Sequence, residues 1–149
     1  LARGPNIMEG YFKDPEATAA TLKGGWLYTG DLGKVDEEGF LYIVDRKKDM
    51  IITGGENIFP REIEEILYAH PKILEAAVIG LPDPEWGEKV HAVVALKEGE
   101  KLTEDEVKDY CKEHIASFKK PKSVEFVDKL PRSPAGKVLK RILRDRQEV

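Results

Sequence analysis

The organisation of the chain is decided by one stretch, Asp45–Glu65, which reads DRKKDMIITGGENIFPREIEE. Its first five residues carry charges of both signs, which are costly to bury, so residues 45–49 are predicted to form an exposed connector. Gly54 and Gly55 lack Cβ atoms, so the backbone there can turn sharply or let a ligand come close. The stretch therefore predicts either a plain surface hairpin or a joint between two bodies beside a ligand site.

Composition excludes several classes of protein. The 149 residues favour one domain and suffice for a core. A net charge of -4 argues against a dedicated nucleic-acid surface. No apolar run approaches the roughly 20 residues that span a bilayer, and no signal peptide opens the chain. Cys111 is the single cysteine, so neither an intrachain disulfide nor a structural zinc site is expected, and a reducing cytoplasm fits best.

The secondary structure expected from hydrophobic periodicity is mixed. Helices are predicted from Pro15 to Leu22, from Pro60 to about Ala69, after the capping-box sequence at 103–106, and over 138–146. A brief strand is predicted at 26–28, a β-hairpin over 32–44, and strands at 76–81, 90–96 and 123–127. Pro82-Asp83-Pro84 is expected to force an extended loop. The fold class is therefore α+β, a roughly three-stranded sheet flanked by helices and preceded by a β-hairpin.

Asp31 follows a glycine at the end of a predicted strand, in the sequence Tyr28-Thr29-Gly30-Asp31. A carboxylate in this place can accept hydrogen bonds from the two hydroxyls of a ribose, as the acidic residue of dinucleotide folds does. The alternative is that Asp31 only caps a turn.

Lys137 ends a stiff loop that reads Pro131-Arg132-Ser133-Pro134-Ala135-Gly136-Lys137. It is predicted to lie at a helix start, where its charge adds to the partial positive charge of the helix. An anion bound there would relieve this repulsion. The loop lacks the first glycine and the Ser/Thr of a Walker A loop. The alternative is a solvated basic loop.

The other residues with catalytic side chains form no recognisable site. His70, His91 and His114 are scattered and have no metal partner at a useful spacing. His91 lies inside an apolar strand and is predicted to be a hydrogen-bonded histidine of the core or a sheet edge. Cys111 lies on the apolar stripe of its helix and is predicted to be a core residue.

Taken together and in order, the motifs resemble those of the AMP-forming acyl-CoA synthetases of the adenylate-forming superfamily. The matching segments are Gly25–Asp31, Asp45–Asp49, Gly54–Pro60 and Pro131–Lys137. They cover only the C-terminal part of that family's architecture. The family's phosphate loop and its aromatic-Gly-x-Thr-Glu motif are absent, as expected if a large N-terminal domain precedes this chain.

The resemblance implies a two-step reaction. A carboxylic acid and Mg-ATP give an acyl-adenylate and pyrophosphate, and the thiol of coenzyme A then displaces AMP. Between the steps the small C-terminal domain of such enzymes rotates and presents a different face to one active site. Residues 1–47 would be the tail of the large AMP-binding domain, and residues 48–149 the mobile lid.

The resemblance also assigns roles to single residues. Asp31 would hold the ribose hydroxyls, and Arg46 would contact the ribose or phosphate of the nucleotide. Lys48 would lie at the pivot. Gly54, Gly55 and Glu56 would line the pantetheine channel of coenzyme A. Lys137 would bridge the acyl carboxylate and the α-phosphate during adenylation.

These assignments lead to a ligase that acts on a fatty or related apolar acid, with ATP, Mg²⁺ and coenzyme A as reactants. Mg²⁺ would be bound mainly by the N-terminal domain, and this chain is expected to hold no metal. The alternatives are an aryl-CoA ligase, a luciferase-like enzyme, a peptide-synthetase adenylation domain or a non-catalytic binding module. The expected location is the cytoplasm, and peripheral membrane association is left open.

Overall fold

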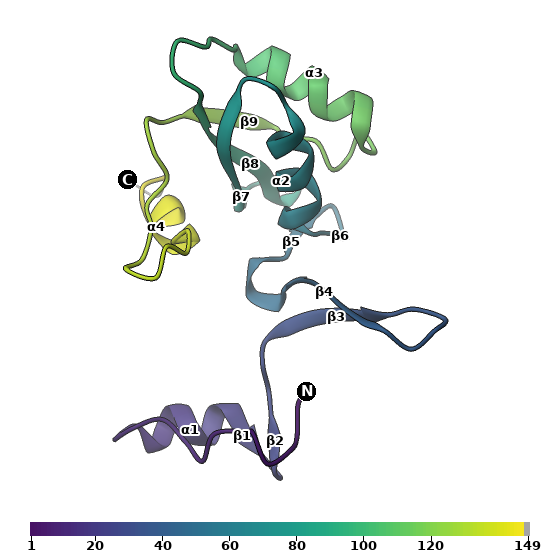
Figure 1. Cartoon of the computed structure of the whole chain (residues 1–149). Helices are drawn as coiled ribbons and strands as arrows, with labels where there is room; N and C mark the ends of the chain where they lie inside the picture. Colours follow the sequence, from purple (N-terminus) through teal and green to yellow (C-terminus); the bar gives the residue numbers. More distant parts are fainter. Residues whose placement is uncertain (148–149) are drawn as a thin grey trace. The chain divides into compact units, whose positions relative to one another are not determined.

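The computed structural model describes residues 1–147 and divides into two compact units, one from Leu1 to Lys48 and one that begins at Asp49 (Figure 1). The division comes one residue after the boundary expected at 47/48. Residues 148 and 149 of the expected second range lie outside the described residues. The fold class is α+β, as predicted.

The first unit is small and contains one α-helix and two pairs of strands. Its helix α1 (Pro15–Thr21) begins as predicted, because the side chain of Asp14 accepts a hydrogen bond from the amide of Ala17 at 2.9 Å. Strands β1 (Leu22–Lys23) and β2 (Trp26–Leu27) form one antiparallel pair, and β3 (Asp31–Val35) and β4 (Leu41–Arg46) form the predicted hairpin. Every residue from 1 to 48 is at least partly exposed.

The second unit is built on a five-stranded sheet, two strands more than expected. Its strands are β5 (Ile51–Thr53), β6 (Glu56–Ile58), β7 (Ile73–Asp83), β8 (Gly87–Leu96) and β9 (Ser123–Phe126). Their order is β6-β5-β8-β7, and β9 pairs with β8 in parallel while the other neighbours are antiparallel. The two additional strands, β5 and β6, have three residues each, too few to show an alternating pattern.

The predicted extended loop at Pro82-Asp83-Pro84 is wrong. Strand β7 runs through Asp83, which pairs with Gly87 at the start of β8. The reversal is tight because the Asp83 carboxylate accepts hydrogen bonds from the amides of Glu85 and Trp86, both at 3.0 Å. Pro82 is tolerated inside the strand.

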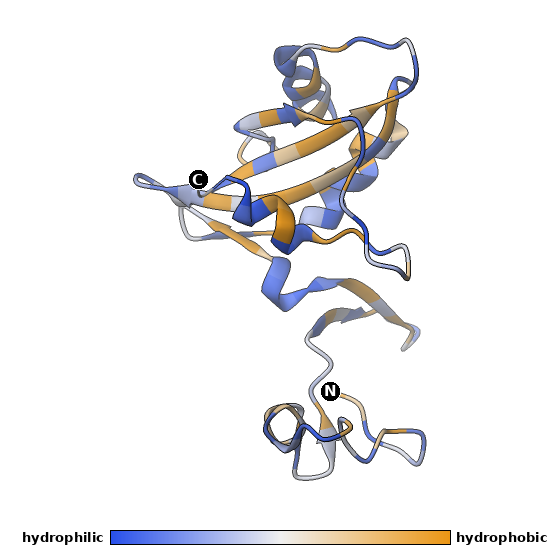
Figure 2. Ribbon diagram, turned by 90° about the vertical axis from the view of Figure 1, so that its left-hand side faces the viewer, coloured by the Kyte–Doolittle hydropathy of each residue, from blue (hydrophilic) through white to orange (hydrophobic). Residues whose placement is uncertain are grey.

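Strands β7 and β8 are buried on both faces, as their continuous apolar sequences predict. Helices α2 (Pro60–Ala69) and α3 (Glu104–His114) pack on one face, over a core that includes Ile63, Val78 and Val94. The short helix α4 (Lys140–Asp145) and the segment before it cover the other face. Figure 1 shows α4 and α2 on opposite sides of the long strands, and Figure 2 shows hydrophobic residues along both strands.

Three further sequence predictions for this unit are confirmed. The capping box that opens α3 is present: the Thr103 hydroxyl accepts from the Glu106 amide, and the Glu106 carboxylate accepts from the Thr103 amide. Cys111 is fully buried, and this burial raises the pKa of its thiol to about 11. His91 is a buried histidine whose Nδ1 lies 2.7 Å from the hydroxyl of Ser123, and burial lowers its pKa.

One ion pair joins both sides of the sheet. The carboxylate of Glu64, on α2, accepts a hydrogen bond from the amide of Val78 at 2.8 Å and lies 2.7 Å from Nζ of Lys140, the first residue of α4. Only about one sixth of either side chain is exposed. The pair therefore holds α2, β7 and α4 together.

Across residues 1–147, no helix is long and apolar enough to cross a membrane.

Candidate functional site

Asp31 and Arg46, both assigned to the nucleotide, lie side by side in the first unit. They form the opening pair of the β3–β4 hairpin, and Nε of Arg46 lies 2.8 Å from the Asp31 carboxylate. The carboxylate can accept about four hydrogen bonds, so this contact does not exhaust it. The arrangement thus presents acceptors for hydroxyls next to a guanidinium that suits a phosphate.

A hollow of about 410 Å³ adjoins this pair and is lined by Gly30, Arg46, Lys47 and Lys48. The amide of Lys47 donates to the carbonyl of Gly30 at 2.8 Å, which closes the hairpin at its base. Three of the four lining residues are cationic, a composition that suits an anionic ligand.

Lys48, assigned to the pivot, is the last residue of the first unit and the middle residue of a single 3-10 turn, η1 (Lys47–Asp49). Of the predicted connector 45–49, Asp45 and Arg46 instead complete strand β4. Asp49 already belongs to the second unit, where its carboxylate lies 2.9 Å from Nη2 of Arg144 on α4. The change from one unit to the other is thus confined to a short segment.

Gly54 and Gly55 form the two-residue turn between β5 and β6, where Thr53 pairs with Glu56. Their φ angles of +57° and +85° are those of a tight hairpin turn. Glycine adopts these angles without strain because it has no Cβ atom. The surroundings of the two glycines differ. A Cβ on Gly54 would lie 2.8 Å from the ring of Trp86, whereas a Cβ on Gly55 would meet nothing within 4 Å. Gly54 therefore makes room for Trp86, and Gly55 faces open space beside the exposed Glu56.

Trp86 was not among the residues selected from the sequence. It lies in the turn between β7 and β8, its carbonyl accepts from the Gly54 amide at 2.9 Å, and Nζ of Lys122 lies 5.8 Å from its ring centroid. The available signal was a large aromatic residue in a turn-forming sequence, Pro84-Glu85-Trp86-Gly87. Its ring packs against Gly54 in the glycine turn.

Lys137 lies in an exposed loop, and its expected position at a helix start is wrong. Helix α4 begins three residues later, at Lys140, and no side chain caps it. The loop is closed instead by its own hydrogen bonds: the Ser133 amide donates to the Lys137 carbonyl at 2.8 Å, and the Lys137 amide lies 3.2 Å from the Ser133 hydroxyl. The argument from helix charge therefore does not apply to Lys137, although its ammonium does lie where a ligand can reach it.

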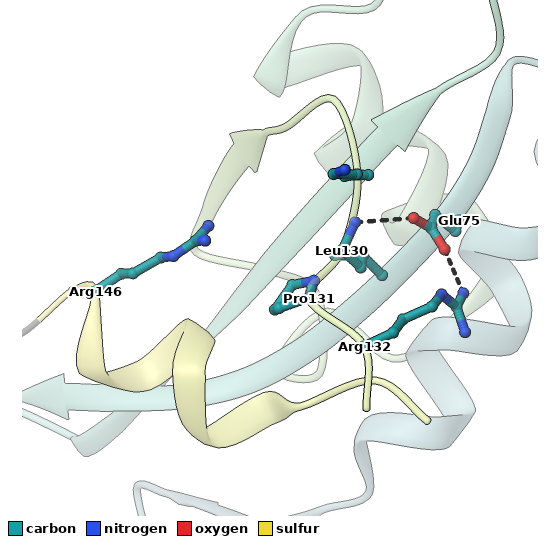
Figure 3. A pocket seen from close by; sticks show the side chains of 6 residues that line it. Glu75, Leu130, Pro131, Arg132 and Arg146 are labelled. Atoms are coloured by element: carbon teal, nitrogen blue, oxygen red, sulfur yellow. Dashed lines mark hydrogen bonds and ion pairs between the residues drawn. The ribbon is translucent and has the colours of Figure 1, made fainter. Parts of the chain in front are cut away.

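A pocket of about 580 Å³ opens beside the start of this loop (Figure 3). It is lined by Glu75, Lys129, Leu130, Pro131, Arg132 and Arg146. Figure 3 shows the Glu75 carboxylate between the amide of Leu130 and the guanidinium of Arg132, and it contacts both. This contact could not be predicted from the sequence, because Glu75 is more than fifty residues away from both partners.

The glycine turn and the Lys137 loop are attached at opposite ends of the β7–β8 pair. Thr53, next to the glycines, pairs with Gly87 at the start of β8. The loop is attached through Glu75, which pairs with Ala95 near the end of β8. Eight residues of strand separate these two points, which corresponds to about 26 Å. The second unit therefore carries its two candidate regions at separate places.

Within residues 1–147, no cluster of three or more His, Cys, Asp or Glu side chains is placed to hold a metal ion.

Comparison with known proteins identifies relatives along almost the whole chain. The long-chain-fatty-acid–CoA ligase of Bacillus subtilis (strain 168) is 51% identical over 143 residues, which are 96% of this chain and 26% of the ligase. ATP-bound MatB from Rhodopseudomonas palustris matches with a TM-score of 0.90 and 44% identity, over 98% of this chain and 29% of MatB. The o-succinylbenzoate CoA synthetase (MenE) of Bacillus subtilis, in complex with the acyl-adenylate intermediate OSB-AMP, matches with a TM-score of 0.88 and 45% identity, over 96% of this chain and 29% of MenE.

The chain spans only 26% to 30% of the length of the curated relatives that it matches. A family model, described as the AMP-binding enzyme C-terminal domain, matches residues 62–137. This range ends on Lys137 and lies entirely within the second unit. The chain belongs to the family of AMP-binding enzyme C-terminal domains.

Proposed function

We propose that this chain is the C-terminal part of an AMP-forming acid–CoA ligase. The observation that carries the proposal is the close match of the chain to ATP-bound and acyl-adenylate-bound relatives, together with the lysine loop and the glycine turn at opposite ends of the β7–β8 pair. In the first step a carboxylate oxygen attacks the α-phosphorus of ATP, and the bond to pyrophosphate breaks. In the second step the sulfur of coenzyme A attacks the acyl carbon, and the bond to AMP breaks.

Lys137 is the proposed catalytic residue of the first step. Attack of a carboxylate on a phosphate brings two anions together, and negative charge develops in the transition state. An ammonium placed between the two groups offsets this repulsion. The exposed position of Lys137 on a hydrogen-bonded loop supports this role, because the side chain can reach a nucleotide that is bound outside this unit.

Asp31 and Arg46 are the proposed nucleotide contacts of the first unit. Asp31 would accept hydrogen bonds from the ribose hydroxyls, and Arg46 would donate to the ribose or phosphate. Their contact at 2.8 Å supports this assignment, because each side chain orients the other.

Gly54, Gly55 and Glu56 are the proposed wall of the channel through which the thiol of coenzyme A reaches the acyl-adenylate. Gly55 supports the assignment best, since the space where its side chain would lie is open. Gly54 has a structural role in addition, because it makes room for Trp86.

The cofactors and partners follow from the same proposal. The reactants are ATP, coenzyme A and a carboxylic acid, and Mg²⁺ would accompany ATP. The described residues do not form a metal site, so we assign none of them to Mg²⁺.

The main protein partner is a preceding domain of the same chain. The exposed apolar side chains of the β3–β4 hairpin, among them Val35, Phe40 and Leu41, are the proposed contact with that domain. A cytoplasmic location is part of the proposal.

The acid is proposed to be a fatty or related apolar acid, on the basis of the 51% identity to a long-chain-fatty-acid–CoA ligase. The second candidate is an aromatic acid, favoured by the 45% identity to o-succinylbenzoate CoA synthetase. We expect the complete protein to release pyrophosphate from ATP with fatty acids of graded length and less rapidly with o-succinylbenzoate. The reverse order would replace the fatty acid by the aromatic one. Absence of release with either acid, together with an unrelated domain upstream of Leu1, would favour a non-catalytic binding module.

Replacement of Lys137 separates the two steps. In the complete protein, Lys137→Ala should abolish acyl-adenylate formation, with a loss of a few kcal/mol of transition-state stabilisation. Thioester formation from supplied acyl-adenylate should continue. Both are measured by single-turnover kinetics, with pyrophosphate and acyl-CoA as the products. An equal loss in both steps would contradict the assigned role.

A side chain at Gly55 should have the opposite effect. Gly55→Leu places a bulky group in the proposed thiol channel, so we expect normal pyrophosphate release and little acyl-CoA. Gly99→Leu is the matched control, because Gly99 also has a positive φ angle and open space around it but lies between β8 and α3, outside the proposed channel. Normal acyl-CoA formation by the Gly55 variant would remove this residue from the site.

A further inference from the structure

Arg132 holds the peptide bond that directly precedes Lys137. Its Nη1 donates to the carbonyl of Gly136 at 2.6 Å, and this carbonyl belongs to the bond between Gly136 and Lys137. Gly136 has a φ angle of +78°, so the loop bends just before the lysine. The guanidinium therefore fixes the plane from which the backbone of Lys137 departs.

The same guanidinium is held by Glu75. Its Nη2 contacts one carboxylate oxygen of Glu75, and the other oxygen accepts from the amide of Leu130 at 2.9 Å. Glu75 thus contacts both the residue that begins the loop segment and the arginine that supports its end. The side chain of Glu75 is 14% exposed, whereas that of Arg132 is 44% exposed.

A bulge in β7 puts Glu75 in this position. Between the pairs Ile73–Leu96 and Glu75–Ala95, strand β7 has one residue more than β8, and Leu74 is the extra residue. The bulge lets Ile73 face the α2 side while Glu75 shares the opposite face with Ala77. Without the extra residue the alternation of the strand would turn one of these side chains to the wrong face.

The charge state of the pair favours a permanent contact. Burial alone would raise the pKa of Glu75, but the hydrogen bond from the Leu130 amide and the guanidinium of Arg132 lower it below its usual value. The carboxylate in turn raises the pKa of Arg132. Glu75 therefore stays ionised at neutral pH.

We propose that Glu75 and Arg132 are positioning residues for the adenylation step, which set the place of Lys137 by holding the Gly136 carbonyl. This inference rests on the proposed function, because it assumes that Lys137 acts in that step. Neither residue needs to touch the substrates. An arginine is required because its planar group can donate in two directions at once, whereas the single ammonium of a lysine is not preorganised to do so.

The test uses the complete protein and three variants. Arg132→Gln removes the guanidinium, Glu75→Gln leaves the arginine charge in place but removes its ionic partner, and Arg141→Gln is the matched control. Arg141 forms an exposed ion pair with Asp145 on α4, takes part in none of the loop hydrogen bonds described above, and has a side chain that is 81% exposed. We measure kcat and KM for ATP in pyrophosphate release, and thioester formation from supplied acyl-adenylate.

Arg132→Gln and Glu75→Gln, the two loop variants, should each lower the kcat of pyrophosphate release by about 10- to 100-fold. A displacement of the Lys137 ammonium by about 1 Å has effects of this size. Their KM for ATP and their thioester formation should not change, and the control should behave like the wild-type protein. In the double variant Arg132→Gln/Lys137→Ala, the loss should not exceed that of Lys137→Ala alone. Retained thioester formation also shows that the variants are folded.

Three outcomes would overturn the inference. If Lys137→Ala abolishes adenylation but the two loop variants do not lower it, Lys137 acts without this support and only the positioning role fails. If Arg132→Gln loses adenylation while Glu75→Gln keeps it, Arg132 acts through its charge and not through the contact with Glu75. If Lys137→Ala itself retains adenylation, the proposed function of the loop fails, and the positioning role fails with it.

Discussion

The structure of the second unit depends on one constraint, the burial of β7 and β8 on both faces. Ala77, Ile79 and Val93 point away from α2 and α3, and they need cover from another part of the chain. Leu130 and Leu143 supply that cover, and both are almost fully buried. The loop that carries Lys137 is the connection between these two leucines. An exposed loop is thereby held at both ends by hydrophobic burial, which contributes about 1.5 to 3 kcal/mol for each such side chain.

Ion pairs also attach the C-terminal segment to the rest of the unit. Three acidic side chains earlier in the chain meet three basic ones near its end, in the pairs Asp49–Arg144, Glu64–Lys140 and Glu75–Arg132. Their contributions to stability differ, because the Arg132 side chain is 44% exposed and screened by solvent whereas the Glu64–Lys140 pair is mostly buried. Their common effect is on geometry. They attach the C-terminal segment to the joint, to α2 and to β7, and so fix how the segment crosses the sheet.

Much of this fold could be predicted from local signals, and the failures have physical causes. Asp14 and the capping box at Thr103 marked helix starts because caps act over three residues. Strands β5 and β6 were missed because three residues show no periodicity. The helix after Lys137 was placed too early because no capping side chain marks its start. The motifs identified Asp31 and Arg46 from the sequence, and the structure shows that the two side chains are in contact. The roles of Glu75 and Trp86 could not be predicted, because their partners lie far away in the sequence.

We propose that one lid serves two reaction steps by turning at Lys48, the last residue before the second compact unit. Lys48→Pro in the complete protein tests it most directly, because proline fixes the φ angle near −65° and removes an amide donor. Rapid-quench measurements of both products are needed. We expect pyrophosphate release to stay at the wild-type rate and acyl-CoA formation to become the slow step. Unchanged acyl-CoA formation would contradict this proposal and would place the pivot elsewhere.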